Sequence, residues 1–231
     1  MLKDHENIPD PSTWILFSDE DLLVVNKPPG LLSIPDGYQR DLPHLTQTLS
    51  PFVGKLWIVH RLDRETSGVM LLARSAEAHR ILNEAFRQRA LKKQYHCLAA
   101  PVPEWDFQDL SLPLRVNADR AHRTRVDFEK GKAARTLVRV LRRGSSFCLL
   151  ECELHSGYTH QIRAHLYHAG LGILGDSLYR PKALTLTESS LSAPRTMLHA
   201  YEIRFAHPRT HFEMAFQAPY PPDFESKLAA L

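Results

Sequence analysis

The sequence has little cysteine. Only three cysteines occur among its 231 residues, at positions 97, 148 and 152. A small, odd number of cysteines argues against a disulfide framework and favours a reducing compartment, so we expect a cytoplasmic protein. Its core must then form without covalent crosslinks. A hydrophobic content of 43% is sufficient for one large domain to do so.

Long hydrophobic runs are missing as well. No window approaches the roughly 18 consecutive apolar residues that a transmembrane helix needs, and the first residues, MLKDHENIPDPSTW, are polar where a signal peptide is apolar. We therefore expect a protein that neither spans a membrane nor is exported. We interpret residues 1–13 as a polar N-terminal arm and residues 14–231 as a single domain, because no linker divides the chain convincingly.

Motifs of several common enzyme classes are also absent. There is no glycine-rich phosphate loop, no nucleophile elbow and no zinc-binding cysteine pair, which argues against nucleotide hydrolases, α/β-hydrolases and zinc deaminases. His165 and His168 share a helical face, which leaves a metal-dependent hydrolase as an alternative. However, His160 falls on another face and no nearby cysteine or carboxylate completes a ligand set. We therefore expect no metal and no other cofactor.

Net charge is small, at +3, but it is unevenly distributed. Residues 115–143 contain ten basic and three acidic side chains, which gives this basic segment a local charge of +7. Such a run is either a solvated surface or an electrostatic footprint for phosphates. Charge alone does not decide between these readings.

Strand-like segments outnumber helical ones. Apolar runs and alternation predict strands over residues 14–17, 22–26, 31–34, 56–59, 69–73, 92–100, 136–141, 147–154, 199–206 and 211–217. Helices are predicted over 44–49, from an N-cap at Ser75 to about 89, from an N-cap at Thr159 to about 169, and at the C-terminus. The short connections favour an α+β fold with a mixed, mostly antiparallel sheet and flanking helices.

Three polar stretches could carry chemistry. In LWIVHRLDRETSGVMLLA, residues 56–73, two apolar strands enclose a charged loop in which Asp63 could be a nucleophile, a general base or a salt-bridged structural residue. Arg163 falls in the first turn of its helix, where the helix dipole disfavours a cation, so we expect a carboxylate partner for it. Tyr95 follows two lysines into a strand and could be an ordinary half-buried aromatic residue.

Together these stretches resemble the RluA-type pseudouridine synthases. HRLDRETSG at 60–68 has the family's pattern of His-Arg-Leu-Asp, two variable positions and Thr-Ser-Gly. NKPPGLL at 26–32, KKQY at 92–95, SGYTHQIRAHL at 156–166 and ILGDSLY at 173–179 resemble its other motifs in the same order. The chain departs from the pattern at Leu171-Gly172, where the family usually has His-Pro. The motifs leave no room before them for the small S4 RNA-binding domain of some relatives.

The resemblance implies the pseudouridine synthase catalytic fold and an isomerase that converts uridines in tRNA, rRNA or both, with no cofactor, membrane or obligate protein partner. Asp63 would be the catalytic nucleophile or base, Tyr95 would lie against the target base, and Arg163 would pair with Asp63. Arg61 would occupy the space that the flipped uridine leaves. Arg64 and Glu65 fall at the variable positions and are interpreted as surface charge.

Further RNA contacts are assigned to residues in or beside these motifs and in the basic segment: His60, Lys27, Lys92, Lys93, Arg120, Arg123 and Arg125. An alternative is a catalytically lapsed RNA-binding protein on the same fold. A lapsed site should have lost at least one of Asp63, Tyr95 and Arg163, and all three are present.

Overall fold

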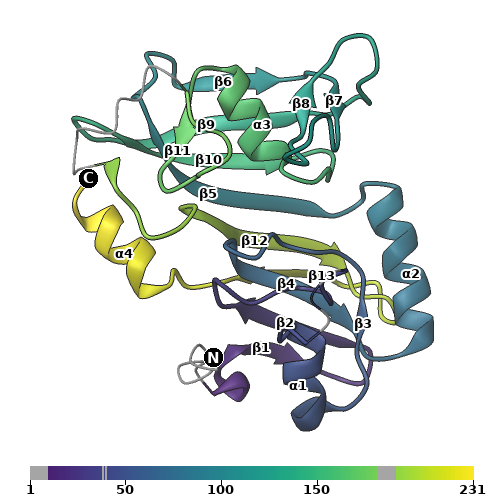
Figure 1. The fold of residues 1–231 in the computed structure, drawn as a ribbon. Coiled ribbons are helices and arrows are strands. Elements are labelled where there is room, and N and C mark those ends of the chain that lie inside the picture. The colour runs from purple at the N-terminus through teal and green to yellow at the C-terminus, as the bar shows by residue number, and fades with distance from the viewer. Residues whose placement is uncertain (1–9, 38, 40, 182–190) are drawn as a thin grey trace. The chain divides into compact units, whose positions relative to one another are not determined.

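The computed structural model describes residues 10–37, 39, 41–181 and 191–231 (Figure 1). Within the span predicted as one domain, the chain forms two compact units. Unit 1 contains the chain up to Leu91 together with Arg204–Pro219, and unit 2 contains Lys92–Ile203 and Tyr220–Leu231. Of the predicted arm, residues 1–9 lie outside the described residues, and Pro11–Trp14 forms the 3-10 helix η1.

Unit 1 is built around the strand β4. Its elements are β1 (Ile15–Ser18), β2 (Leu22–Lys27), α1 (Leu45–Val53), β3 (Trp57–Ile58), β4 (Ser67–Ala73), α2 (Ala76–Arg87) and β13 (Glu213–Gln217). β4 pairs antiparallel with both β2 and β3, and all seven of its residues are buried. The helix α2 packs on β3 and β4 (Figure 1). The sequence of β4 is therefore apolar because neighbouring strands and a helix bury the whole strand.

Unit 2 contains most of the remaining strands. They are β5 (Lys92–Ala100), β6 (Phe107–Leu110), β7 (Leu114–Arg115), β8 (Arg125–Val126), β9 (Thr136–Arg143), β10 (Cys148–Leu154) and β11 (Gly172–Ile173). β5, β10, β9 and β6 pair in that order, each antiparallel to the next. β12 (Leu198–Ala206) carries the chain from unit 2 into unit 1. The helices are α3 (Gln161–His168), which packs on β8, β9 and β11, and α4 (Pro222–Ala229).

The predicted fold class is confirmed, because the structure is α+β with mostly antiparallel strand pairing. The strand over 92–100 and the N-cap at Ser75, whose hydroxyl accepts from Ala78 N at 3.1 Å, are also confirmed. The three cysteines are buried thiols without disulfides. Among the described residues, no helix has the length and apolarity that crossing a membrane requires.

The strand predicted over 31–34 was wrong. Leu32 forms only an isolated parallel bridge with His44, in which Leu32 O accepts from Leu45 N. The neighbouring Leu31 O accepts from the Lys27 ammonium, so a side chain takes the place of a strand partner there. An apolar run alone did not reveal these side-chain and capping partners.

Lys27 is the most unusual residue in the core of unit 1. Its side chain is fully buried, with 0% of its surface exposed. The ammonium donates to the carbonyl oxygens of Pro28 at 2.8 Å, Leu31 at 2.9 Å and Arg64 at 3.2 Å. A buried lysine is tolerated where its N–H donors are satisfied. Here the three hydrogen bonds connect the loop after β2 with the loop that contains Arg64.

Replacing Lys27 with methionine should therefore destabilise the protein. The substitution keeps a long side chain but leaves three carbonyl oxygens without this donor, so we expect a loss of about 3 kcal/mol in the free energy of unfolding. Urea unfolding measures it. The matched control is Lys92→Met at an exposed site, which should change stability by less than about 0.5 kcal/mol. Equal stability of the two variants would contradict the role given to Lys27.

A buried histidine in unit 2 is held in its neutral form. His96 on β5 stacks on Tyr201 with 4.0 Å between ring centroids, and its Nδ1 lies 2.5 Å from the Tyr220 hydroxyl. Burial, assisted by the nearby His199 and opposed by Glu202, lowers the pKa of His96 to about 4. Burial also raises the pKa of Tyr220 to about 12, so the hydroxyl stays protonated beside the neutral imidazole.

This shift makes stability depend on pH in a defined window. The unfolded chain binds a proton at His96 near pH 6.5, whereas the native state binds it only near pH 4. Stability should therefore be full above about pH 6.5 and fall as the pH drops towards 4, by up to about 3 kcal/mol from this residue. Chemical denaturation across this range should show a shallower fall for His96→Gln than for wild type. Parallel curves would rule out His96 as the source.

Candidate active site

Asp63 lies in a short loop that two paired strands hold at both ends. β3 and β4 pair through Trp57 with Ala73 and Ile58 with Leu72, so the chain between them forms a closed loop. Within it Thr66 N donates to Asp63 O at 3.1 Å, and the Asp63 side chain is half-buried. The expected clamp of two apolar strands around a charged loop is present. Such anchoring fixes the position of a carboxylate.

A second loop of unit 1 fixes the Asp63 loop from another direction. The buried Ser33 hydroxyl donates to Leu62 O at 2.7 Å and accepts from Leu62 N at 3.0 Å. Gly30 N donates to Arg64 O at 2.8 Å, and Arg64 Nε donates to Gly30 O at 3.0 Å. Leu62 before Asp63 is thus bound to Ser33, and Arg64 after it is bound to Gly30 of the NKPPGLL motif. Sequence reasoning missed Ser33, and it interpreted Arg64 as surface charge only.

The RNA-contacting residues predicted in unit 1 have different surroundings. Arg61 is exposed next to the Asp63 loop. His60 is half-buried, where its Nε2 accepts from Leu71 N at 2.9 Å and its ring stacks on Phe86 at 4.8 Å between centroids. The full burial of Lys27 argues against the RNA contact assigned to it. His60 and Lys27 therefore stabilise the loop and its surroundings, and the RNA contact of Arg61 stays a prediction.

In unit 2, Arg163 forms a buried ion pair in the first turn of α3. Its Nε lies 2.6 Å from Asp176 Oδ2 and its Nη2 lies 2.8 Å from Asp176 Oδ1, and both side chains are less than 10% exposed. This parallel two-bond geometry fixes the plane of the guanidinium. The carboxylate partner expected for a cation at a helix N-terminus is therefore present, supplied by the ILGDSLY motif.

The turn after Leu174 orients Asp176. Besides Arg163, Asp176 Oδ1 accepts from Leu178 N at 2.9 Å and Tyr179 N at 3.0 Å. Gly175 precedes it with a φ of +76°, and a Cβ atom at Gly175 would lie 1.8 Å from Arg195 O. Only glycine fits this combination of backbone conformation and close approach. Nearby, Leu171-Gly172 stands where the family usually has His-Pro. The sheet continues there without distortion, because Gly172 of β11 pairs with Ala100 of β5.

The start of α3 differs from the prediction. Thr159 is not the N-cap: the cap is His160, which has a left-handed backbone (φ 57°, ψ 22°) and makes no side-chain cap bond. Thr159 O accepts from the Thr124 hydroxyl at 2.6 Å instead. Gln161 organises the turn, because its Oε1 accepts from Ser156 Oγ at 2.8 Å and Tyr158 N at 3.2 Å. The start of α3 is thus left without a side-chain cap, and Gln161 holds the turn that precedes it.

The other predicted residues of unit 2 lie on β5. Tyr95 is buried, at 8% exposure, and is paired opposite Cys152. Lys92 is exposed at the start of the strand, and Lys93 is half-buried with its Nζ close to Gly157 of the SGYTHQIRAHL motif. The KKQY and SGYTHQIRAHL motifs are therefore neighbours in unit 2.

The structure does not favour the metal-dependent alternative. His165 is fully buried, its Nε2 donates to Leu112 O at 3.0 Å and its Nδ1 lies 2.9 Å from the Thr136 hydroxyl. Burial lowers the pKa of His165, so it is a neutral core residue. Both ring nitrogens are thus used by the protein, which leaves neither for a metal.

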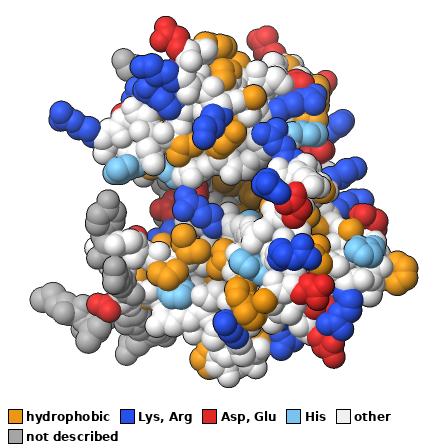
Figure 2. Space-filling model, turned by 90° about the vertical axis from the view of Figure 1, so that its right-hand side faces the viewer, with side chains coloured by type: hydrophobic (Ala, Val, Ile, Leu, Met, Phe, Trp, Pro, Cys, Tyr) orange, Lys and Arg blue, Asp and Glu red, His pale blue; other side chains and the backbone are white. Residues whose placement is uncertain are grey.

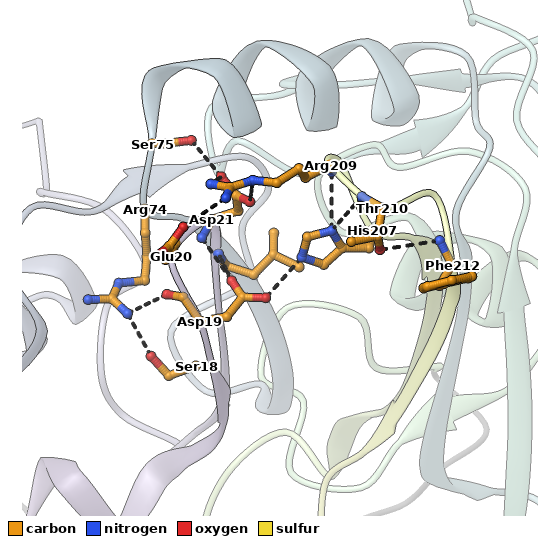
Figure 3. Close-up of polar contacts among 11 residues, drawn as sticks. Ser18, Asp19, Glu20, Asp21, Arg74, Ser75, His207, Arg209, Thr210 and Phe212 are labelled. Atoms are coloured by element: carbon orange, nitrogen blue, oxygen red, sulfur yellow. Dashed lines mark hydrogen bonds and ion pairs between the residues drawn. The ribbon is translucent and has the colours of Figure 1, made fainter.

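Among the described residues, Asp19, Asp21 and His207 of unit 1 are the group whose ligand atoms lie close enough to hold a metal ion. Figure 3 shows that these atoms bind protein partners. His207 Nδ1 accepts from Arg209 N and Thr210 N, both at 3.1 Å, so Nε2 carries the proton and donates to Asp19 Oδ2 at 2.9 Å. Arg209 binds both oxygens of Asp21, at 2.7 and 3.0 Å. This arrangement fits an ion-pair network rather than a metal centre.

Carboxylates partly neutralise the basic segment. Six of its arginines form ion pairs: Arg115 with Asp127, Arg123 and Arg125 with Asp119, Arg135 with Asp109, Arg139 with Glu151, and Arg143 with Asp106. Asp106, Asp109 and Glu151 lie outside the segment, so the local charge of the segment overstates the charge of its surface. On the face shown in Figure 2, basic side chains are interspersed with acidic and apolar ones. Arg120 and Arg125 are exposed, and Arg123 is half-buried.

The predicted catalytic residues thus divide between the two units. Asp63 lies in unit 1, whereas Tyr95 and Arg163 lie in unit 2. Each unit fixes its own residues by buried contacts. The partner found for Arg163 is Asp176 of the same unit, and the pairing of Arg163 with Asp63 stays a prediction.

Comparison with known proteins identifies the family. Residues 21–168 match the family model described as RNA pseudouridylate synthase. The chain is 35% identical to the dual-specificity RNA pseudouridine synthase RluA of Pasteurella multocida, over 91% of this chain and 94% of that protein. It is 33% identical to the ribosomal large subunit pseudouridine synthase D of Neisseria meningitidis, covering 97% of this chain but only 63% of that longer relative.

A solved structure supports the same assignment. The human RNA pseudouridylate synthase domain containing 4 superposes with a TM-score of 0.76 at 26% sequence identity, covering 94% of this chain and 92% of that one. The expected pseudouridine synthase fold is therefore confirmed. The chain belongs to the RluA family of RNA pseudouridine synthases, and it is an isomerase.

Proposed function

We propose that this enzyme isomerises uridines in tRNA, rRNA or both, and that Asp63 is its catalytic carboxylate. The observation that carries the proposal is the fixation of the Asp63 loop, in which strand pairing, Ser33 and Gly30 all hold the backbone on either side of Asp63. A group that must meet a reacting atom needs such anchoring. The relatives named for the ribosomal large subunit support an rRNA substrate by analogy.

Pseudouridine formation breaks the bond between uracil N1 and the ribose, turns the base and joins C5 to the same ribose carbon. The proton that C5 loses is balanced by the proton that N1 gains, so the reaction needs neither a redox partner nor an energy source. Asp63 acts in it as a nucleophile or as a base, and either role requires the ionised carboxylate. Tyr95 lies against the target base in this proposal and assists the proton transfer.

Arg163 is assigned an electrostatic role. Its bidentate pair with Asp176 holds the guanidinium plane in one orientation, so the side chain is organised before RNA binds. We propose that Arg163 also pairs with Asp63. The target base must leave its stack, at a cost of a few kcal/mol that is smaller in a loop than in a duplex. Arg61, Lys92 and the exposed arginines of the basic segment would hold the RNA during that step.

The proposal also covers location and partners. The three cysteines are thiols that burial shields, and burial raises the pKa of Cys148 to about 12. Such cysteines suit the reducing cytoplasm that the sequence predicts. RNA is the partner that the function requires, and no protein partner is needed for the mechanism given above.

The function is tested by incubating the purified protein with bulk RNA that lacks pseudouridine. We expect new carbodiimide-reactive sites at a small set of uridines in stable RNA, and mapping them identifies the substrate. A folded protein that produces no such site in any stable RNA would overturn the proposal. Mapping the sites that disappear in a deletion strain provides the matching measurement in cells.

Substitution of Asp63 by asparagine tests the chemistry separately from binding. Because asparagine keeps the shape but cannot act as a nucleophile or base, turnover should fall by at least about a thousandfold. Affinity for the same RNA should stay within a few-fold in a filter-binding measurement.

The matched control is Glu65→Gln, the nearby carboxylate at a variable motif position, which should retain turnover. Loss of turnover in Glu65→Gln alone would move the catalytic role away from Asp63. Persistence of turnover in Asp63→Asn would exclude Asp63 as the catalytic group.

A further inference from the structure

Unit 2 contains a pocket of about 290 Å³ beside the last turns of α3. Its walls include Arg123, Arg125 and Val126 of the basic segment, Tyr167 and His168 of α3, and Tyr179 of the ILGDSLY motif. Its floor is firm, because Ala164 and Tyr179 belong to a buried apolar cluster with Leu114 and Ala134. This volume lies at the lower end of the range for ligand pockets, which begins at about 300 Å³, so the pocket suits a group no larger than a single nucleotide.

One wall of the pocket is cationic and is held in place. Arg123 Nε lies 2.8 Å and Arg125 Nη2 lies 2.6 Å from the same oxygen, Asp119 Oδ2. Asp119 Oδ1 also accepts from Ala121 N at 3.0 Å and Arg123 N at 3.1 Å, which fixes the carboxylate. Two guanidinium groups share one carboxylate, so the wall keeps a net positive charge. Oriented arginines of this kind bind phosphate oxygens well.

The same pocket is also lined by aromatic rings. Tyr167 is 42% exposed, and its ring meets Tyr179 edge-on at 6.1 Å between centroids. Tyr179 is buried, and its hydroxyl accepts from Thr124 N at 2.6 Å. An exposed aromatic ring in one pocket with arginine side chains is the combination that proteins use for unpaired bases.

The pocket adjoins the proposed catalytic residues of unit 2. The Arg163 guanidinium lies over the Tyr179 ring, 5.0 Å from its centroid, and Asp176 holds the backbone of Tyr179 at 3.0 Å. Tyr179 therefore contacts Arg163 and also lines the pocket. Tyr179 thus connects the pocket with Arg163.

We propose that this pocket binds one unstacked nucleotide adjacent to the target uridine, with its phosphate at Arg123 and Arg125 and its base against Tyr167. The inference rests on the proposed function and adds a determinant of substrate choice to it. An RNA that presents a second unpaired nucleotide at the right distance from the target uridine is favoured. The pocket reads the shape of the RNA strand as well as the base, which suits recognition of loops.

The test uses a hairpin RNA made around a uridine that the wild-type protein converts, with an abasic ribose placed at each flanking position in turn. On the unmodified hairpin, Tyr167→Ala should raise KM by about 5- to 150-fold, the change expected for the loss of one stacked base, with a smaller change in kcat. Tyr167→Phe keeps the ring and should rescue KM to within a few-fold of wild type. Phe128→Ala is the matched control, since Phe128 is 74% exposed in the basic segment and does not line the pocket.

The proposal is decided by whether the effects of Tyr167→Ala and of an abasic position in the RNA are additive. At one flanking position the abasic hairpin should weaken wild type as much as Tyr167→Ala does, and the two changes together should add nothing further. Additive effects at every flanking position would overturn the proposal. So would a result in which Arg125→Gln weakens binding but Tyr167→Ala does not, because that indicates a phosphate contact only. A wild-type protein that converts no RNA would instead disprove the proposed function, so the two failures are distinguishable.

Discussion

The buried pair between Arg163 and Asp176 is the interaction on which unit 2 depends most. A guanidinium and a carboxylate that are both removed from water must satisfy each other, and here the parallel bonds are supplemented by two backbone donors to Asp176. Loss of either partner would leave an isolated charge in the interior. The pair also joins two motifs that lie apart in the sequence, and it explains why an arginine is tolerated in the first turn of α3.

Unit 1 also holds a charged loop by buried contacts, but with different groups. The loop that contains Asp63 lies next to an entirely buried strand, and Lys27 and Ser33 bind its backbone. Lys27 is the clearest example, because a residue type usually found on surfaces binds carbonyl groups in the core. Each unit thus positions its share of the proposed catalytic residues by its own contacts.

Much of the fold followed from the sequence, because periodicity and N-cap chemistry are local signals. The strand over 92–100 and the helix beginning after Ser75 are examples. The failures occurred where contacts that periodicity does not encode decide the backbone. Residues 31–34 form only an isolated bridge at Leu32, and the Lys27 ammonium binds Leu31 O. Helix α3 begins after His160, which has a left-handed backbone and makes no side-chain cap bond. Within the site, the family resemblance predicts Asp63, Tyr95 and Arg163, but the sequence did not indicate that Asp176 binds Arg163 or that Ser33 holds the residue before Asp63.

Gly175 shows that a residue without any chemical role can still be indispensable for the structure around Asp176. It has no side chain with which to bind RNA or move a proton, yet the carbonyl of Arg195 occupies the space that any Cβ would need. In a survey of inactivating substitutions, this position would therefore score like a catalytic residue. Intolerance to substitution in this enzyme thus marks two kinds of position, those that touch the substrate and those at which the backbone of unit 2 has no spare room.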